Sequence, residues 1–269
     1  MNKLIKLGSV SFLNAKPLTY ALENNLIDHE FDLIQTPPSE LSLKLHNKEI
    51  DIGLIPVAEL LKRKDYRVVP QISISSIGKV DSVIVLSKSD LRDLKTIAVD
   101  KRSQSSTALL RIVLEIFYGV EPSYISRNID KEDFLDGVDG AMLIGDSGLK
   151  KCYDADNTYK LYDLGEIWTG ETGLPFVYAV FAVNEGVILG KNLDALLESK
   201  NYGLGIVDKI AETESQKIGI AKDVCLKYLT DRIKYDLGEE EIKGIIKYSE
   251  LLSELNEAEK ISDLNLYSE

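Results

Sequence analysis

Short apolar runs, several of them rich in β-branched residues, alternate with amphipathic helical patterns along the first two thirds of the chain. The helical patterns occupy Ser39–Asn47, Ala58–Lys62 and Thr107–Tyr118. Alternation of this kind predicts an α/β architecture with parallel sheets, because helices connect neighbouring parallel strands. The expected strands are Leu4–Leu7, Asp51–Ile55, Val68–Ser73, Ser82–Ser87, Thr96–Val99, Gly140–Ile144 and Phe176–Val183.

The final third has an almost entirely helical pattern, from Gly190 to Glu259. No internal repeat and no Pro/Ser-rich linker is present, so a domain boundary would have to consist of crossing strands. The candidates are Val83–Ser87 and Phe176–Val183, which bracket a middle segment of domain size. We therefore expect one lobe from residues 1–85 with 182–269, and a second from residues 86–181. The pattern alone leaves one domain and two domains open.

Composition excludes several functional classes. The 269 residues carry a net charge of −12 and a pI near 4.8, which argues against binding to nucleic acid or to an anionic membrane surface. The longest apolar run, Leu174–Val183, is too short to span a bilayer. Polar residues interrupt the N-terminal apolar run, so we expect no signal peptide and a cytoplasmic protein. Cys152 and Cys225 have no metal-ligand spacing, which favours reduced, structural thiols.

The stretch Gly8–Leu18 is the first candidate site. It follows a short strand, and Pro17 stands where a first helical turn tolerates proline. Ser9, Ser11 and Asn14 would then lie in a loop at the carboxyl end of a strand, where open α/β sheets bind ligands. An ordinary strand-to-helix connection is the alternative.

Two more loops follow predicted strands. In the segment from residue 100 to residue 107, Ser105, Ser106 and Thr107 could cap a helix or could join its free N–H groups in an anion site. Gly145 and Asp146 follow Gly140–Ile144 in the same way. Asp146 is either a helix N-cap or a residue that orients a ligand or another side chain.

The two histidines give no evidence of acid–base or metal chemistry. His29 and His46 both lie in polar stretches and are expected to be solvated surface residues. We therefore expect no metal site. Trp168 and Phe176 flank a Gly/Pro-rich loop and are more often core residues than ligand platforms.

Five short motifs occur in order along the chain: Ser11–Leu18 (SFLNAKPL), Asp51–Val57, Asp81–Val83, Gly140–Asp146 and Thr172–Phe176. Together they resemble the chorismate dehydratase family, which acts in the futalosine route to menaquinone. The resemblance extends from about residue 4 to about residue 250. It implies a type II periplasmic-binding-protein-like fold: two α/β lobes joined by two crossing strands, with a ligand cleft between them.

The resemblance also implies an activity and a site. Members of the family remove water from chorismate, a dianion, and need no cofactor. For this reaction we expect Asn14 and Ser82 at the reacting centre, as hydrogen-bond partners of the leaving hydroxyl and one substrate carboxylate. We expect the helix start at Ser105, Ser106 and Thr107 to hold the other carboxylate. Ser9, Ser11, Gly145 and Asp146 would complete the substrate site.

Two alternatives remain open. A non-catalytic solute- or effector-binding protein can share this fold, because fold alone does not fix function. The related dihydroxynaphthoate synthases use a catalytic histidine in the second lobe, where this chain has none.

Overall fold

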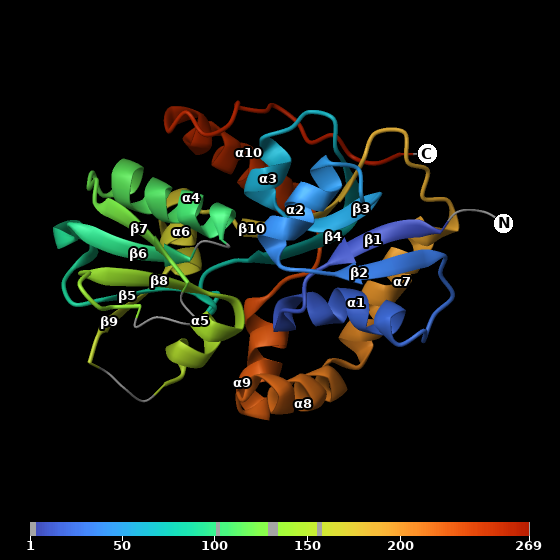
Figure 1. Ribbon diagram of the computed structural model, residues 1–269, viewed down its shortest axis with the longest axis horizontal. Coiled ribbons are helices and arrows are strands. Elements are labelled where there is room, and N and C mark those ends of the chain that lie inside the picture. Colours follow the sequence, from blue (N-terminus) through green and yellow to red (C-terminus); the bar gives the residue numbers. More distant parts are fainter. Residues whose placement is uncertain (1–3, 101–102, 129–133, 155–157, 269) are drawn as a thin grey trace.

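The computed structural model places the chain in two α/β lobes, each built around a five-stranded sheet (Figure 1). It describes residues 4–100, 103–128, 134–154 and 158–268. All the strands expected from the sequence are present. Three more, β2 (Phe31–Gln35), β7 (Ser123–Arg127) and β9 (Lys160–Asp163), lie at sheet edges, where polar and half-exposed residues hide the apolar pattern. The strands are β1 (Ile5–Ser9), β2 (Phe31–Gln35), β3 (Ile52–Pro56), β4 (Arg67–Ser76), β5 (Val83–Ser87), β6 (Thr96–Asp100), β7 (Ser123–Arg127), β8 (Gly140–Ile144), β9 (Lys160–Asp163) and β10 (Phe176–Val183).

In the first two thirds of the chain, most strands are followed along the sequence by a helix. The expected helix near Thr107 begins three residues earlier, at Gln104, and continues as the π-helical turn η3. The helical segments are η1 (Leu13–Ala15), α1 (Lys16–Glu23), α2 (Pro38–His46), α3 (Val57–Leu61), η2 (Leu91–Asp93), α4 (Gln104–Arg111), η3 (Ile112–Phe117), α5 (Gly145–Cys152), α6 (Leu164–Thr172), α7 (Lys191–Gly205), α8 (Val207–Ile218), α9 (Lys222–Lys227), η4 (Tyr228–Arg232) and α10 (Glu239–Glu254).

The two sheets have the same pattern of strand order and strand direction. Their orders are β2-β1-β3-β10-β4 and β7-β6-β8-β5-β9. The pairs of β1 with β2 and β3, and of β6 with β7 and β8, are parallel, whereas β10 and β5 run antiparallel to their neighbours. The expectation of wholly parallel sheets is therefore wrong. β5 starts at the edge where β8 ends, with Val83 opposite Ile144, because the chain has just arrived from the other lobe.

The chain crosses between the two sheets just before β5 and just before β10, and not within these strands. β5 pairs with strands of the second sheet and β10 with strands of the first, so the boundaries at 85/86 and 181/182 fall inside these strands. The chain changes sheet in segments 77–82 and 173–175. We propose that the lobes consist of residues 4–76 with 176–268, and of residues 83–172.

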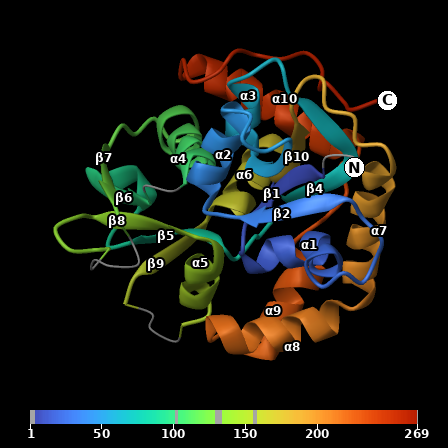
Figure 2. The ribbon, with the colours of Figure 1, turned by 45° about the vertical axis from the view of Figure 1, so that its right-hand side comes forward.

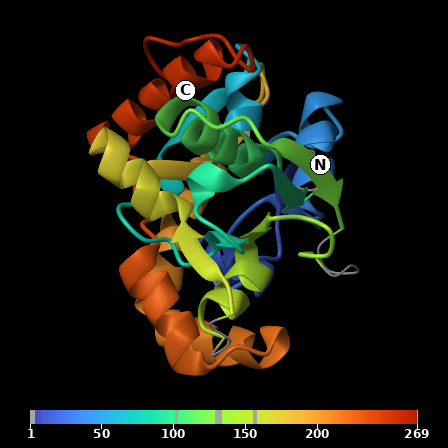
Figure 3. The ribbon, with the colours of Figure 1, turned by 90° about the vertical axis from the view of Figure 1, so that its left-hand side faces the viewer.

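The C-terminal helices pack on both sides of the molecule (Figures 2 and 3). α7 and α8 lie against α1, and Gly203 of α7 comes so close that an added Cβ would be 2.0 Å from the Pro17 carbonyl oxygen. On the other side, α10 packs on β10 and η3. The tail thus supports both the N-terminal loop and the crossing segment 173–175.

Trp168 and Phe176 are core residues, as expected. Both are buried, and their rings meet edge to face with centroids 5.1 Å apart. Tyr248 of α10 adds edge-to-face contacts to both rings. The indole N–H of Trp168 donates to the Pro175 carbonyl oxygen, which ties the packing to the crossing segment.

Within the described residues, no helix is long and apolar enough to cross a membrane.

Candidate active site

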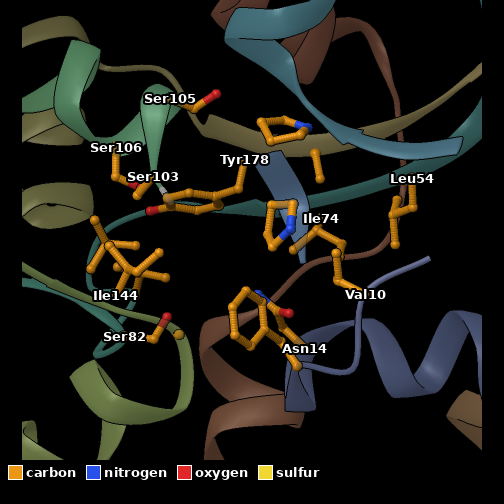
Figure 4. Close-up of a pocket in the computed structure, with 17 residues that line it drawn as sticks. Val10, Asn14, Leu54, Ile74, Ser82, Ser103, Ser105, Ser106, Ile144 and Tyr178 are labelled. Carbon is orange, nitrogen blue, oxygen red and sulfur yellow. The ribbon is translucent and has the colours of Figure 1, made fainter. Parts of the chain in front are cut away.

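A cleft lies between the lobes at the ends of the central strands (Figure 4). It encloses about 730 Å³ when its opening to solvent is included. Apolar groups dominate its wall, with a few amide and hydroxyl groups among them. The lining residues are Val10, Phe12, Asn14, Pro38, Leu54, Pro56, Ile74, Val80, Ser82, Val83, Ser103, Ser105, Ser106, Ile144, Gly145, Tyr178 and Ala179.

Five helices begin at or beside the cleft. Lining residues Asn14, Pro38, Pro56, Ser103 and Gly145 stand at or next to the starts of α1, α2, α3, α4 and α5. This follows from the topology, because each of these helices follows the carboxyl end of a strand. Helix N-termini present unpaired N–H groups and a partial positive charge. Among the described residues that line the cleft, none carries a carboxylate, amine, guanidinium or imidazole group.

The N-terminal loop places Asn14 in the wall. Phe12 accepts a backbone hydrogen bond from Ala15, which forms η1, and Pro17 follows in the first turn of α1. Of the serines predicted here, Ser9 is buried at the end of β1 and Ser11 is exposed, and neither lines the cleft.

Asp146 reaches across the cleft to this loop. Its carboxylate accepts a hydrogen bond of 3.1 Å from the Leu13 backbone N–H, while Ile144 occupies the N-cap of α5 without a side-chain cap. The N-cap alternative is therefore wrong. Burial raises the pKa of Asp146, and the Leu13 N–H opposes that rise. Beside it, the left-handed Gly145 (φ +57°) leaves room for the ring of Phe12.

Ser82 ends the crossing segment 77–82 and is held from two directions. The backbone N–H groups of Val80 and Asp81 donate to the Asp163 carboxylate at distances of 3.0 and 2.7 Å. From the other side, Gly148 of α5 packs so closely that an added Cβ would lie 2.4 Å from the Ser82 carbonyl oxygen. Gly148, which has no side chain, therefore allows α5 to approach the Ser82 backbone this closely.

The start of α4 brings three serines to the cleft, on the side facing Asn14 and Ser82 in Figure 4. Ser105 and Ser106 line the wall as predicted, together with the N-cap residue Ser103. The Ser105 hydroxyl also accepts a 3.0 Å hydrogen bond from the Ala58 N–H of the first lobe. Thr107 is not among the residues that line the cleft, and its hydroxyl donates to the Ser103 carbonyl oxygen at 2.6 Å. Lys101 and Arg102 of this segment lie outside the described residues.

The histidines lie away from the cleft lining. His46 is exposed, whereas His29 is half-buried, with its ring nitrogens at the Leu22 carbonyl and the Phe31 N–H. The expectation of a solvated His29 is thus wrong, although its contacts are structural. Across the described ranges, no group of three or more His, Cys, Asp or Glu side chains could hold a metal ion.

Sequence comparison establishes the family. A family model described as menaquinone biosynthesis matches residues 5–254. The chain belongs to this family. A curated relative, the chorismate dehydratase of Thermus thermophilus, is 30% identical over 263 residues, covering 91% of this chain and 94% of its own. The resemblance seen in the motifs is confirmed.

Solved structures confirm the fold. A protein from Archaeoglobus fulgidus matches with a TM-score of 0.77 at 20% identity, covering 94% of this chain and 97% of its own. The alkanesulfonate-binding protein of Xanthomonas axonopodis pv. citri, bound to MOPS, matches with a TM-score of 0.71 at 16% identity, covering 96% and 94%. This menaquinone-biosynthesis family member therefore has the periplasmic-binding-protein fold.

The structure adds two tyrosines that the motifs did not reveal in this family member. Tyr178 of β10 lines the cleft, and its hydroxyl pairs with that of Ser76 at 3.0 Å. Tyr228 begins η4 in the C-terminal tail, and its hydroxyl donates to Ser82 Oγ at 2.8 Å. The aromatic and apolar alternation of β10 gave a weak signal for Tyr178. Nothing in the local sequence distinguishes Tyr228 from other buried helical tyrosines.

Proposed function

We propose that this protein is a chorismate dehydratase, which eliminates water from chorismate to give 3-[(1-carboxyvinyl)oxy]benzoate in the cytoplasm. The observation that carries the proposal is that Asn14 and Ser82, from two separate motifs of the family, line one cleft. Helix N-termini surround the cleft, which suits a dianionic substrate. The 30% identical relative is itself named chorismate dehydratase.

This elimination depends more on how the substrate is positioned than on strong acids or bases in the protein. The ring C3–H bond breaks and its electrons form a π bond to C4, from which the hydroxyl group leaves. The proton and the hydroxide together make the water lost, and the ring becomes aromatic. Aromatisation drives the reaction, so the protein must fix the elimination-competent conformer and stabilise charge that spreads into the ring carboxylate.

We assign Asn14 and Ser82 to the leaving hydroxyl and to one substrate carboxylate, as hydrogen-bond partners. The other carboxylate would lie at the start of α4, against Ser103, Ser105 and Ser106 and the free N–H groups of that turn. Thr107 is not part of this proposal, because its hydroxyl is engaged with its own helix.

The proton acceptor, in this proposal, is the enolpyruvyl carboxylate of chorismate itself. The lining supplies an amide, hydroxyls and a phenol, and Asp146 is engaged with the Leu13 N–H. A carboxylate tethered next to C3 has a very high effective concentration once its rotamer is fixed, so a weak base suffices. An analogue with this carboxylate masked should bind and fail to eliminate, while Asp146→Asn should keep measurable turnover. Elimination from the masked analogue, with Asp146→Asn inactive, would place the base in the protein.

The test of the function is incubation of the purified protein with chorismate, followed by absorbance and product mass. We expect loss of one water, in the presence of EDTA as well, because amide and hydroxyl groups line the cleft. Asn14→Ala and Ser82→Ala should each lower turnover roughly a hundredfold and lower stability by no more than ~0.5–3 kcal/mol. Asn201→Ala and Ser253→Ala, at exposed helical positions, are the matched controls. Tight binding without any change in ligand mass would show a binding protein instead.

A further inference from the structure

One π-helical turn from the C-terminal tail holds two consecutive residues of the crossing segment. Tyr228, the first residue of η4, donates its hydroxyl hydrogen to Ser82 Oγ at 2.8 Å. Arg232, the last residue of η4, donates from Nε to the Asp81 carboxylate at 2.7 Å. Asp81 has a left-handed backbone (φ +62°), a conformation that non-glycine residues adopt at a cost. π-helical turns inside helices occur often at functional sites.

The Tyr228 hydroxyl is buried close to the proposed reacting centre. Tyr228 is 1% exposed, and the Asn14 side chain opposes the rise in its pKa that burial causes. Ser82 and Asn14 come from different motifs and line the same cleft. Tyr228 therefore lies close to both residues that the proposed function assigns to the reacting centre, and it is hydrogen-bonded to Ser82.

The direction of the hydrogen bond decides what Ser82 can do. The phenol is the donor in this hydrogen bond, and burial, which raises the pKa of Tyr228, keeps it protonated. A serine hydroxyl has one hydrogen to donate and two lone pairs to accept with. Because Ser82 Oγ accepts from Tyr228, its own hydrogen is left to point elsewhere, and Ser82 lines the cleft.

We propose that Tyr228 is a positioning residue for the dehydration, orienting the Ser82 hydroxyl so that its hydrogen is presented to the substrate in the cleft. This inference rests on the proposed function, because it assigns Tyr228 a role in that same reaction. Without the phenol hydroxyl, Ser82 could turn its hydrogen towards other acceptors, and fewer molecules would hold the productive geometry.

Tyr228→Phe keeps the ring and removes the hydroxyl. We expect kcat to fall about tenfold, the size of effect that one lost neutral hydrogen bond gives, with little change in KM and in melting temperature. Tyr235→Phe is the matched control. Tyr235 is a buried tyrosine in the same segment, and its hydroxyl has no hydrogen-bond partner among the described residues. It should keep wild-type kcat.

The decisive measurement is a double-mutant cycle with Ser82→Ala. If Tyr228 acts through Ser82, adding Tyr228→Phe to Ser82→Ala should change kcat by less than about twofold, because the group it orients is already absent. The same tenfold loss in both backgrounds would show a general structural role and overturn the inference. Unchanged kcat in Tyr228→Phe, or in Ser82→Ala, would overturn it too. A wild-type protein that does not dehydrate chorismate would instead overturn the proposed function.

Discussion

Replacing Gly148 by alanine tests how closely α5 must approach Ser82. A Cβ at this position would lie 2.4 Å from the Ser82 carbonyl oxygen, about 1 Å inside the 3.4 Å at which ordinary van der Waals contact begins. The obstructing atom belongs to the backbone, so no side-chain rotation can relieve the clash. Either α5 or the segment that ends at Ser82 must move by a similar distance.

The consequences should appear in both stability and rate. Overpacking of this kind costs about 1–3 kcal/mol, which corresponds to a fall in melting temperature of roughly 2–12 °C for a chain of this size. A misplacement of about 1 Å at a reacting group can lower the rate by about a hundredfold. We therefore expect Gly148→Ala to fold, to melt earlier and to lose most of its chorismate turnover.

Gly170→Ala is the matched control, because Gly170 also lies in a helix but an added Cβ there meets no atom within 4 Å. Alanine is the better helix former by roughly 0.5–1 kcal/mol, so this variant should be slightly more stable and fully active. The measurements are thermal unfolding and kcat on the two purified variants. A Gly148→Ala protein with wild-type kcat would refute the argument that this close packing positions Ser82.

Three further predictions concern binding, catalysis and acid stability. Thr107→Val should leave KM for chorismate unchanged in steady-state kinetics, since the Thr107 hydroxyl bonds to its own helix; a clearly raised KM would return it to the site. The double variant His29→Gln, His46→Gln should keep essentially full kcat, and a large loss would mean that a histidine takes part in proton transfer. The Thr96 hydroxyl and the Thr96 and Lys95 N–H groups lower the pKa of Asp139, so its stabilising effect is present above the ordinary aspartate pKa of 3.8 and is lost as the pH falls through its own lowered value. Asp139→Asn should therefore lose less stability than wild type between neutral pH and about pH 3 in urea unfolding; equal losses would contradict this.

Several parts of the fold could be predicted from the sequence because local patterns encode them. The inner strands, such as Gly140–Ile144 and Phe176–Val183, are continuous apolar runs because both of their faces are buried. The edge strands β2, β7 and β9 escaped prediction because half-exposed strands carry polar residues that do not differ from loops. The antiparallel direction of β5 and β10 was not predicted either, because the sequence of a strand does not indicate from which lobe the chain enters it.

Some residues of the candidate site could also be predicted from the sequence, and others could not. The motifs pointed to Asn14, Ser82 and Gly145, and the predicted helix start pointed to Ser105 and Ser106; these five residues line one cleft in the structure. Their assigned roles remain predictions. Local sequence could predict helix starts after strands, and the shared direction of parallel strands then gathers those starts at one edge.

Only the tertiary structure decided which polar groups are engaged and with what. Asp146 is bonded to Leu13 across the cleft, and Thr107 is engaged within its own helix. Tyr228 lies 146 residues from Ser82 along the chain, yet the two hydroxyl groups are 2.8 Å apart. The sequence alone determined the alternation of strands and helices, and with it the edge at which a ligand would bind. Contacts between distant segments depend on how the C-terminal helices pack back on the crossing segment, and no local periodicity carries that information.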